Sequence, residues 1–262
     1  MHPRISQRIF QSTAAAAVLA LLPACLAMPP DGEAVTAQRP TLSSDTATSY
    51  EGTFEVEGGL AFDPSDSFDS PVSVKYGVGP ATEVFLGLSP YQSVDQGGAD
   101  GDGFGDLTLG TRHRFWEEAD GPGSAAFQLV TKLPTGDEDE GLSTGEVDFF
   151  GAGIYTAALD VATLTGYYEL GVLGEDPGSG SDLQHVLAVA AARNLHQHVG
   201  VFGELATVLL PEGEDSVLAT LGATYAVSSS LVFDAGVVLG LDEDAPDAVF
   251  QVGFTTNYGP IF

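Results

Sequence analysis

The stretch TFEVEGGLAFDPSDSFDSPVSVKYGV, Thr53 to Val78, consists of two alternating segments joined by an acidic connection. Apolar and polar residues alternate strictly in Phe54–Glu57 and again in Val72–Lys75. A period of two places one kind of side chain on each face of a β-strand. This stretch therefore predicts two strands of a sheet that has one apolar face and one polar face.

The same pattern continues to the end of the chain and predicts twelve strands. They span 53–62, 71–78, 82–89, 106–116, 125–133, 148–158, 162–173, 183–195, 199–210, 216–227, 231–241 and 248–258. Alternate connections differ in kind. The odd-numbered ones are longer and acidic, and they carry about half of the 37 acids, whereas the even-numbered ones are mostly short. This asymmetry is typical of a transmembrane antiparallel β-barrel with an even number of strands, and an all-β barrel of about 12 strands is the predicted fold.

Both termini fit export to a bacterial outer membrane. Residues 1–27 have the basic start and apolar run of a signal peptide, with cleavage expected after Ala27. Cys25 either leaves with this signal or is lipidated, and both alternatives stay open. We expect residues 28–50 to form a flexible leader, because they are polar and contain proline, and residues 51–262 to form the barrel. The terminal Phe262 is the type of residue that barrel assembly machinery is expected to recognise.

The charge balance excludes some partners. A formal net charge of −29 should repel nucleic acid. An apolar fraction of 44% is too high for a disordered acidic chain. The outer loops have almost no basic residues, so we expect Ca²⁺ or Mg²⁺ to bridge their carboxylates to lipopolysaccharide.

Two acidic loops raise the question of a metal site. In KLPTGDEDEGLSTGEVDFF, Lys132 to Phe150, the residues at Asp137 and Asp139 are spaced like calcium ligands, as are Asp100 and Asp102 in an earlier loop. Neither loop completes an EF-hand pattern, so weak calcium binding and a solvated acidic loop both remain possible readings. A phosphate loop is excluded, because it requires Lys where Leu142 stands.

Side chains alternate between the two faces of each strand, and this alternation assigns most charged residues to the lumen. A charge that faced lipid would cost about 2–4 kcal/mol. The predicted lumen-lining bases are Lys75, Arg112, Arg114 and Lys132. The predicted lumen-lining acids are Glu55, Glu57, Glu83, Asp106, Glu169, Glu204 and Asp234. These charges either pair as structural salt bridges or line a polar pathway, and the two interpretations are compatible.

Two motifs carry a family resemblance. GFGDLTLGTRHRF, Gly103 to Phe115, and TKLPTGDEDEGLSTGEVDF resemble the G-x-G-D-L and PTGD…GLGTG…D motifs of a bacterial outer-membrane family named for the meta pathway of phenol degradation. Ser143 stands where glycine is usual, and His113 replaces the usual aromatic residue. The resemblance covers residues 52–262. It implies an outer-membrane barrel that moves small hydrophobic or aromatic compounds.

These observations favour an outer-membrane channel for small molecules, without a cofactor and without catalysis. The chain lacks the G-x-S-x-G and H-E-x-x-H motifs of common hydrolases. Two alternatives stay open: a closed structural or surface-interaction barrel, and a secreted soluble β-sandwich. The expected partners are outer-membrane lipid and lipopolysaccharide, the assembly machinery and small solutes.

Overall fold

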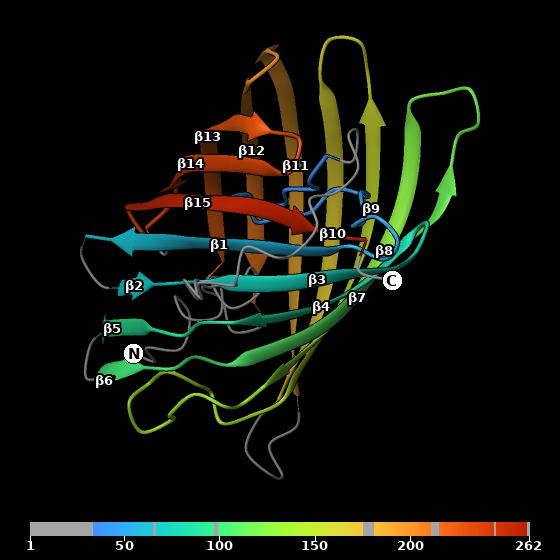
Figure 1. Cartoon of the computed structure of the whole chain (residues 1–262). Coiled ribbons are helices and arrows are strands. Elements are labelled where there is room, and N and C mark those ends of the chain that lie inside the picture. Colours follow the sequence, from blue (N-terminus) through green and yellow to red (C-terminus); the bar gives the residue numbers. More distant parts are fainter. Residues whose placement is uncertain are drawn as a thin grey trace.

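The chain folds into a β-barrel with short extra strands at one end (Figure 1). The computed structural model describes residues 34–64, 67–96, 99–174, 181–210, 215–243 and 245–260. The strands are β1 (Phe54–Asp63), β2 (Ser67–Asp69), β3 (Val72–Gly79), β4 (Thr82–Leu88), β5 (Gln92–Gln96), β6 (Ala99–Gly103), β7 (Leu107–Glu117), β8 (Gly123–Leu133), β9 (Asp148–Ala158), β10 (Thr163–Gly174), β11 (Ser181–His196), β12 (Val199–Leu209), β13 (Ser216–Ser228), β14 (Leu231–Gly240) and β15 (Ala248–Tyr258). Among these residues, no helix is long and apolar enough to cross a membrane.

Twelve of these strands form the wall: β1, β3, β4 and β7 to β15. Each pairs antiparallel with its neighbour, and the wall closes where β1 pairs with β15, from Phe54 opposite Tyr258 to Phe62 opposite Phe250. Closure leaves no unpaired strand edge in the wall. The predicted fold, an antiparallel barrel of twelve strands, is confirmed, and β9 and β15 have the predicted bounds.

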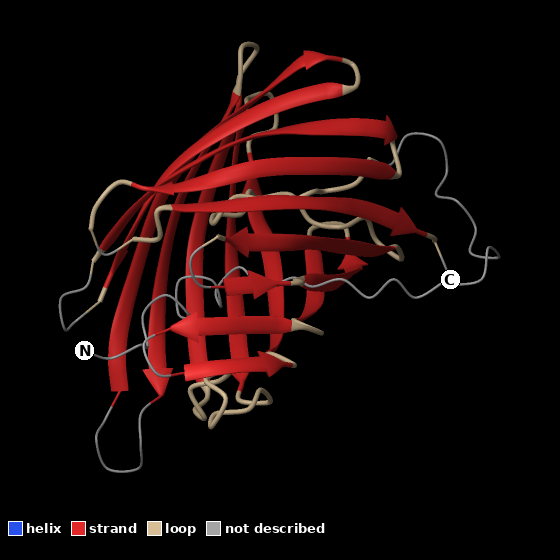
Figure 2. Ribbon diagram, turned by 90° about the vertical axis from the view of Figure 1, so that its left-hand side faces the viewer, coloured by secondary structure: helices blue, strands red, loops and turns tan. Residues whose placement is uncertain are grey.

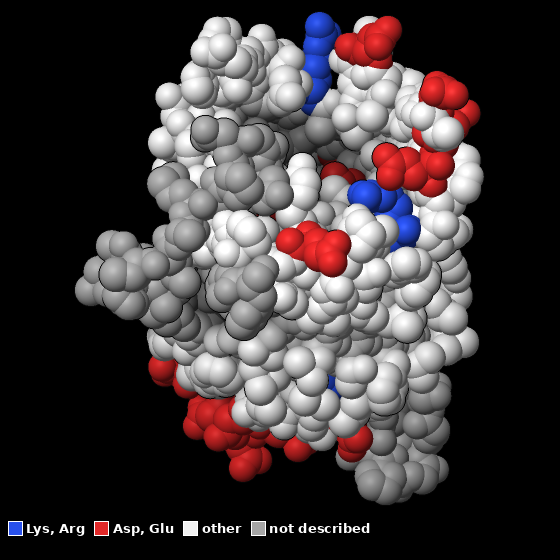
Figure 3. Space-filling model, turned by 45° about the vertical axis from the view of Figure 1, so that its right-hand side comes forward, with Lys and Arg blue, Asp and Glu red and all other residues white. Residues whose placement is uncertain are grey.

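The outer face of the wall is apolar. Side chains at alternate positions are exposed there, for example Leu109, Leu129 and Phe233, while their neighbours Thr108, Gln128 and Asp234 are buried. Figure 3 shows the charged side chains mainly at the two ends of the molecule, with a broad belt of other residues between them. Such a belt is what a hydrocarbon layer around the barrel requires.

The three remaining strands replace two segments that the sequence predicts as loops. Pairing of β1 with β3 ends at Gly58 opposite Val72, and the rest of β1 pairs instead with β2. The order then continues from β2 to β5 and β6. These strands continue the sheet at the end of the barrel that carries the long loops, which we call the loop end. The opposite end, with the short connections such as that between β3 and β4, is the turn end.

Residues 34–50 lie inside the barrel. Figure 1 shows this segment in blue, surrounded by the strands of the wall. In the side view of Figure 2, loops lie in the space that the strands enclose. Its first part lies at the turn end, where the Val35 amide donates to the Ser229 carbonyl. Its last part returns to that end, where the Gly52 and Gly77 backbones are hydrogen bonded. We call residues 34–50 the plug segment. The sequence predicts a flexible leader at 28–50, and the structure places residues 34–50 of it in the lumen, where side chains of the wall bind their backbone. The predicted signal peptide at 1–27 lies outside the described residues.

Candidate functional site: a plugged lumen with one charged and one apolar wall

The lumen has a charged wall on β1, β3, β4, β7 and β8. Register brings opposite charges together here, because Glu55 lies opposite Lys75 and Glu83 lies opposite Arg112. The Lys75 Nζ is 2.7 Å from a carboxylate oxygen of Glu55 and 2.7 Å from one of Glu57. One Arg112 guanidinium nitrogen is 3.3 Å from Glu83. These side chains are almost fully buried, so removing one partner would leave an uncompensated charge in a region with little water.

Two acids of this wall also bind the plug segment. Glu55 accepts hydrogen bonds from the Thr36 amide at 2.7 Å and the Thr36 hydroxyl at 2.8 Å. Glu57 accepts one from the Gln38 amide at 2.7 Å. The Lys75 ammonium completes the contact, because it donates to the Thr36 carbonyl at 2.9 Å. Except at Val35, whose amide donates to the Ser229 carbonyl, this part of the plug backbone is therefore bound by side chains of the wall.

Two further acids bind the middle and the end of the plug segment. Glu204 accepts from the amides of Leu42 at 2.8 Å and Ser43 at 2.9 Å, and also from the Ser43 hydroxyl. Glu83 accepts from the Ser49 amide at 2.7 Å and the Ser49 hydroxyl at 2.9 Å. Hydrogen bonds to a carboxylate are stronger than those between neutral groups. Four lumen carboxylates thus fix the path of the plug.

The plug also brings a cation of its own into the lumen. The Arg39 Nε is 3.8 Å from a carboxylate oxygen of Asp234 on β14. Two glycines leave the space for this guanidinium. A Cβ at Gly59 would stand 2.3 Å from the Arg39 Nη2, and one at Gly253 would stand 2.8 Å from its Nε. The alternation along the strand predicted that Asp234 faces the lumen. It did not predict Arg39 as the partner, because Arg39 lies in the segment expected to be a leader.

The acidic loop between β8 and β9 is anchored from inside the barrel. Lys132, which is fully buried, pairs with Asp106 at 3.0 Å and Asp148 at 2.9 Å. The Ser143 hydroxyl and the Gly136 amide both donate to Asp106. Most of these residues belong to the two sequence motifs that resemble the phenol-degradation family. The motifs therefore meet in space as one polar cluster at the loop end.

The four consecutive acids of that loop stand at exposed positions. Asp137, which is exposed, accepts hydrogen bonds from the amides of Asp139 and Glu140, as in an ordinary turn. Asp102 and Asp139 are exposed, and the side chain of Asp100 is outside the described residues. Among the residues that the structure describes, no three His, Cys, Asp or Glu side chains are grouped to hold a metal ion.

Asp69 is a half-buried acid at the loop end, on β2. Burial raises the pKa of the Asp69 carboxyl from 3.8 to about 6, against the opposing effects of a hydrogen bond from Ser89 and the charge of Arg39. This group therefore changes charge close to neutral pH.

Ten of the eleven predicted lumen residues are buried, and the exception is Arg114. A bulge between Arg114 and Trp116 shifts the register at the end of β7. Arg114 lies there with 24% of its side chain exposed and pairs with Glu117 at 3.1 Å. It does not take part in the buried network, because the bulge ends the alternation that the prediction assumed.

The rest of the lumen wall is largely apolar. The alternation of side chains along the strands did not predict this apolar wall. Its inward side chains come from β1 and from β8 to β15: Ala61, Ala126, Ala152, Ile154, Tyr167, Val186, Ala188, Ala206, Val208, Leu218, Val238 and Val249. Leu42 of the plug and Ala245 of the last outer loop pack against this apolar wall. The sequence signal is the lack of alternation in strands such as ELATVLL, Glu204 to Leu210, where both faces are apolar.

A few polar side chains interrupt the apolar wall and are poorly paired. Glu169 is 2% exposed and accepts one hydrogen bond, from the Tyr167 hydroxyl at 2.6 Å. Gln184 is 1% exposed, and neither atom of its amide has a hydrogen-bond partner among the residues that the structure describes. Within the same residues, the buried Ser216 hydroxyl also has no partner. Buried polar groups of this kind require an explanation such as water or a ligand.

Two internal cavities remain beside the plug. One, of about 150 Å³, lies between the plug and β10 to β13 and is lined largely by small side chains such as Ala190, Thr165 and Gly200. The other, of about 80 Å³, lies between Leu42, Tyr167 and the charged wall. Each has room for only a few water molecules. The plug therefore leaves narrow spaces on both of its sides.

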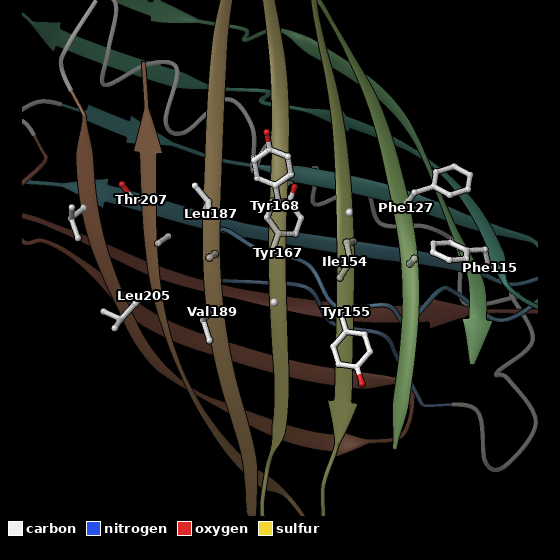
Figure 4. A pocket seen from close by; sticks show the side chains of 16 residues that line it. Phe115, Phe127, Ile154, Tyr155, Tyr167, Tyr168, Leu187, Val189, Leu205 and Thr207 are labelled. Carbon is white, nitrogen blue, oxygen red and sulfur yellow. The ribbon is translucent and has the colours of Figure 1, made fainter. Parts of the chain in front are cut away.

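A larger hollow of about 730 Å³ lies on the outside of the barrel (Figure 4). The outward-facing side chains that border it include the aromatic residues Phe127, Tyr155 and Tyr168. The hollow is deepest at Gly153 and Gly166, which have no side chain and where an added Cβ would meet nothing within 4 Å. Because it faces away from the lumen, this hollow is not part of the candidate site.

A family model described as "Putative MetA-pathway of phenol degradation" matches residues 37–258. The chain belongs to this family, and the resemblance seen in the two motifs is confirmed. No curated protein matches the chain.

Solved structures support the fold. An outer membrane channel from Pseudomonas putida F1 has a TM-score of 0.59 and 11% identity, covering 88% of this chain and 100% of that one. The KdgM porin has a TM-score of 0.57 and 5% identity, over 78% of this chain and 99% of that one. The NanC porin has a TM-score of 0.55 and 8% identity, over 79% and 99%. The fold of this chain is thus that of outer-membrane channels and porins.

Proposed function

We propose that this protein is a passive channel of the bacterial outer membrane for small organic molecules, which the plug segment closes in the state described here. The observation that carries this proposal is the way the plug is held. Its backbone is bound by carboxylate side chains and not by strand pairing, so it can leave while every hydrogen bond of the wall stays intact. Family membership and the apolar wall support small apolar or aromatic solutes as cargo.

The energetics are compatible with a plug that moves. Eight hydrogen bonds join the plug to the four carboxylates. A hydrogen bond to a charged group contributes about 1.5–3 kcal/mol, and ordering one residue costs about 1–2 kcal/mol. The total over these bonds is of the same order as the cost of ordering the plug. A small change in either quantity is therefore enough to shift the equilibrium between closed and open states.

The test is conductance in planar bilayers. We expect a variant that lacks residues 34–48 to conduct severalfold more than the full chain, since the lumen then fills with water. The double variant Glu83→Gln and Glu204→Gln keeps every residue but weakens two plug contacts, and it should conduct between these two limits. Asp160→Asn, in an exposed turn, is the matched control and should behave as the full chain.

The alternative candidate is a closed structural barrel. It is favoured if the shortened chain migrates on gels as a folded, heat-modifiable barrel and yet does not conduct. Folding is thus measured separately from passage.

A further inference from the structure

We propose that the Leu42–Ser43 turn of the plug occupies a solute-binding site, and that this site takes small apolar or aromatic molecules that carry a hydrogen-bond donor, an O–H or N–H group. Anionic molecules of the same shape are excluded from it. The inference rests on the proposed channel function and specifies what the lumen binds.

The turn presents the chemistry of such a solute. The Leu42 side chain packs on the apolar wall, while the amides of Leu42 and Ser43 donate to the two oxygens of Glu204. Glu204 is 4% exposed, and no Lys or Arg of the described residues forms an ion pair with it. When the turn leaves, this buried carboxylate needs other donors. A solute that replaces the turn must bring them, together with an apolar body.

Further acceptors lie on the same wall, farther along the strands from this turn. Tyr167 lies opposite Ala188, and Ala188 lies opposite Ala206, two residues from Glu204 on the inward face of β12. The Tyr167 hydroxyl donates to Glu169, which has no cation as a partner among the described residues. Gln184, opposite Gly171 on the neighbouring strand, has a buried amide without a hydrogen-bond partner among the described residues. The apolar wall thus carries two carboxylates without a paired cation and one such amide at different levels along the barrel.

Space for a solute begins at this turn. The cavity of about 80 Å³ is bounded by Leu42, Tyr167, Phe85 and Val130 on its apolar sides. Arg39, Lys75 and Arg112 also line this cavity, but each of them is paired with an acid. Glu204, which holds the turn, has no such partner among the described residues, so it would repel an anion and accept a hydrogen bond from an O–H or N–H group.

The first experiment uses the unaltered chain. Phenol and anisole have the same ring, but only phenol can donate a hydrogen bond, and benzoate adds a negative charge. Hydrogen exchange of the Leu42 and Ser43 amides is measured in reconstituted protein with each compound. We expect phenol to accelerate this exchange about threefold to tenfold and anisole and benzoate to leave it unchanged, while the amides of Thr36 and Gln38, bound elsewhere, serve as internal controls.

The second experiment uses variants. Glu204→Gln and Glu169→Gln keep the shape of the site but remove its charge. In liposome uptake, the preference for phenol over anisole should fall towards one in both variants and persist in Asp160→Asn. Equal responses to phenol and anisole in the unaltered chain would overturn the proposal, as would an unchanged preference in both variants. Hydrogen exchange does not depend on conduction, so failure of the site is distinguishable from failure of the channel.

Discussion

Gly59 and Gly253 show how single residues make room for the plug. Both stand where Arg39 crosses the lumen towards Asp234, and neither could carry a Cβ without close contact to the guanidinium. At Gly59 the added atom would also meet the Val252 carbonyl at 2.6 Å. These glycines therefore serve the plug as well as the wall.

We expect Gly59→Ala to displace Arg39, to lower the free energy of unfolding by about 1–3 kcal/mol and to raise the basal conductance. Gly166→Ala is the control, because its Cβ would meet nothing within 4 Å, and it should change neither quantity appreciably. The measurements are urea unfolding in detergent and bilayer conductance. Identical behaviour of the two variants would show that Arg39 does not depend on this space.

The single residue Asp69 should make the free energy of unfolding depend on pH. Its pKa of about 6 lies above the unfolded value of 3.8, so the folded protein binds more protons between these values. The contribution of Asp69 to stability should therefore increase as the pH falls from 7 to 4. Asp69→Asn removes the titrating group, and the difference in unfolding free energy between the two chains should follow this sign. If the difference in unfolding free energy between the two chains stayed constant from pH 7 to pH 4, the raised pKa of Asp69 would be contradicted.

At the scale of elements, the loop between β8 and β9 is held by one lysine. Lys132→Met would leave Asp106 and Asp148 buried without their cation, and losing one partner of a buried ion pair costs about 3–5 kcal/mol. We expect hydrogen exchange of residues 136–146 to become faster and the barrel to unfold at lower urea. Asp139→Asn, at an exposed position of the same loop, is the control. Unchanged protection of the loop in the lysine variant would show that other contacts hold it.

The elements also show what could be predicted from the sequence. Strands β9 and β15 have their predicted bounds, and the charged wall follows from alternation, because polar and apolar residues take opposite faces there. The apolar wall could not be found this way, since both faces of its strands are apolar. The plug could not be found either, because its contacts, such as Leu42 with Glu204, join positions 162 residues apart and follow no period. Strand β2 was missed because it forms only where β1 extends beyond its pairing with β3.

For the whole molecule, the balance of charge predicts the sign of ion selectivity. The buried lumen acids that the structure describes outnumber the bases Arg39, Lys75, Arg112 and Lys132. Acidic loops add further negative charge at the loop end. A negative lining raises the local concentration of cations, so the open channel should be cation-selective.

This selectivity should weaken as salt rises, because exposed charges are screened over about 8 Å at physiological ionic strength. The reversal potential across a KCl gradient, measured at low and at high salt, checks the expectation. Changing all four acids from Asp137 to Glu140 to amides should reduce the selectivity at low salt. An anion-selective potential would refute the argument from charge.

The path of the plug has a mechanical consequence. Its first and last residues both lie at the turn end, near Ser229 and Gly77, so it enters the barrel as a bent loop and is not threaded through it. Extraction therefore needs neither unfolding of the wall nor passage of a chain end. Tension applied ahead of Val35 would peel the contacts away one after another, beginning with Glu55 and Glu57. The 17 residues, once extended, would reach about 55–60 Å from the start of β1 beyond the turn end.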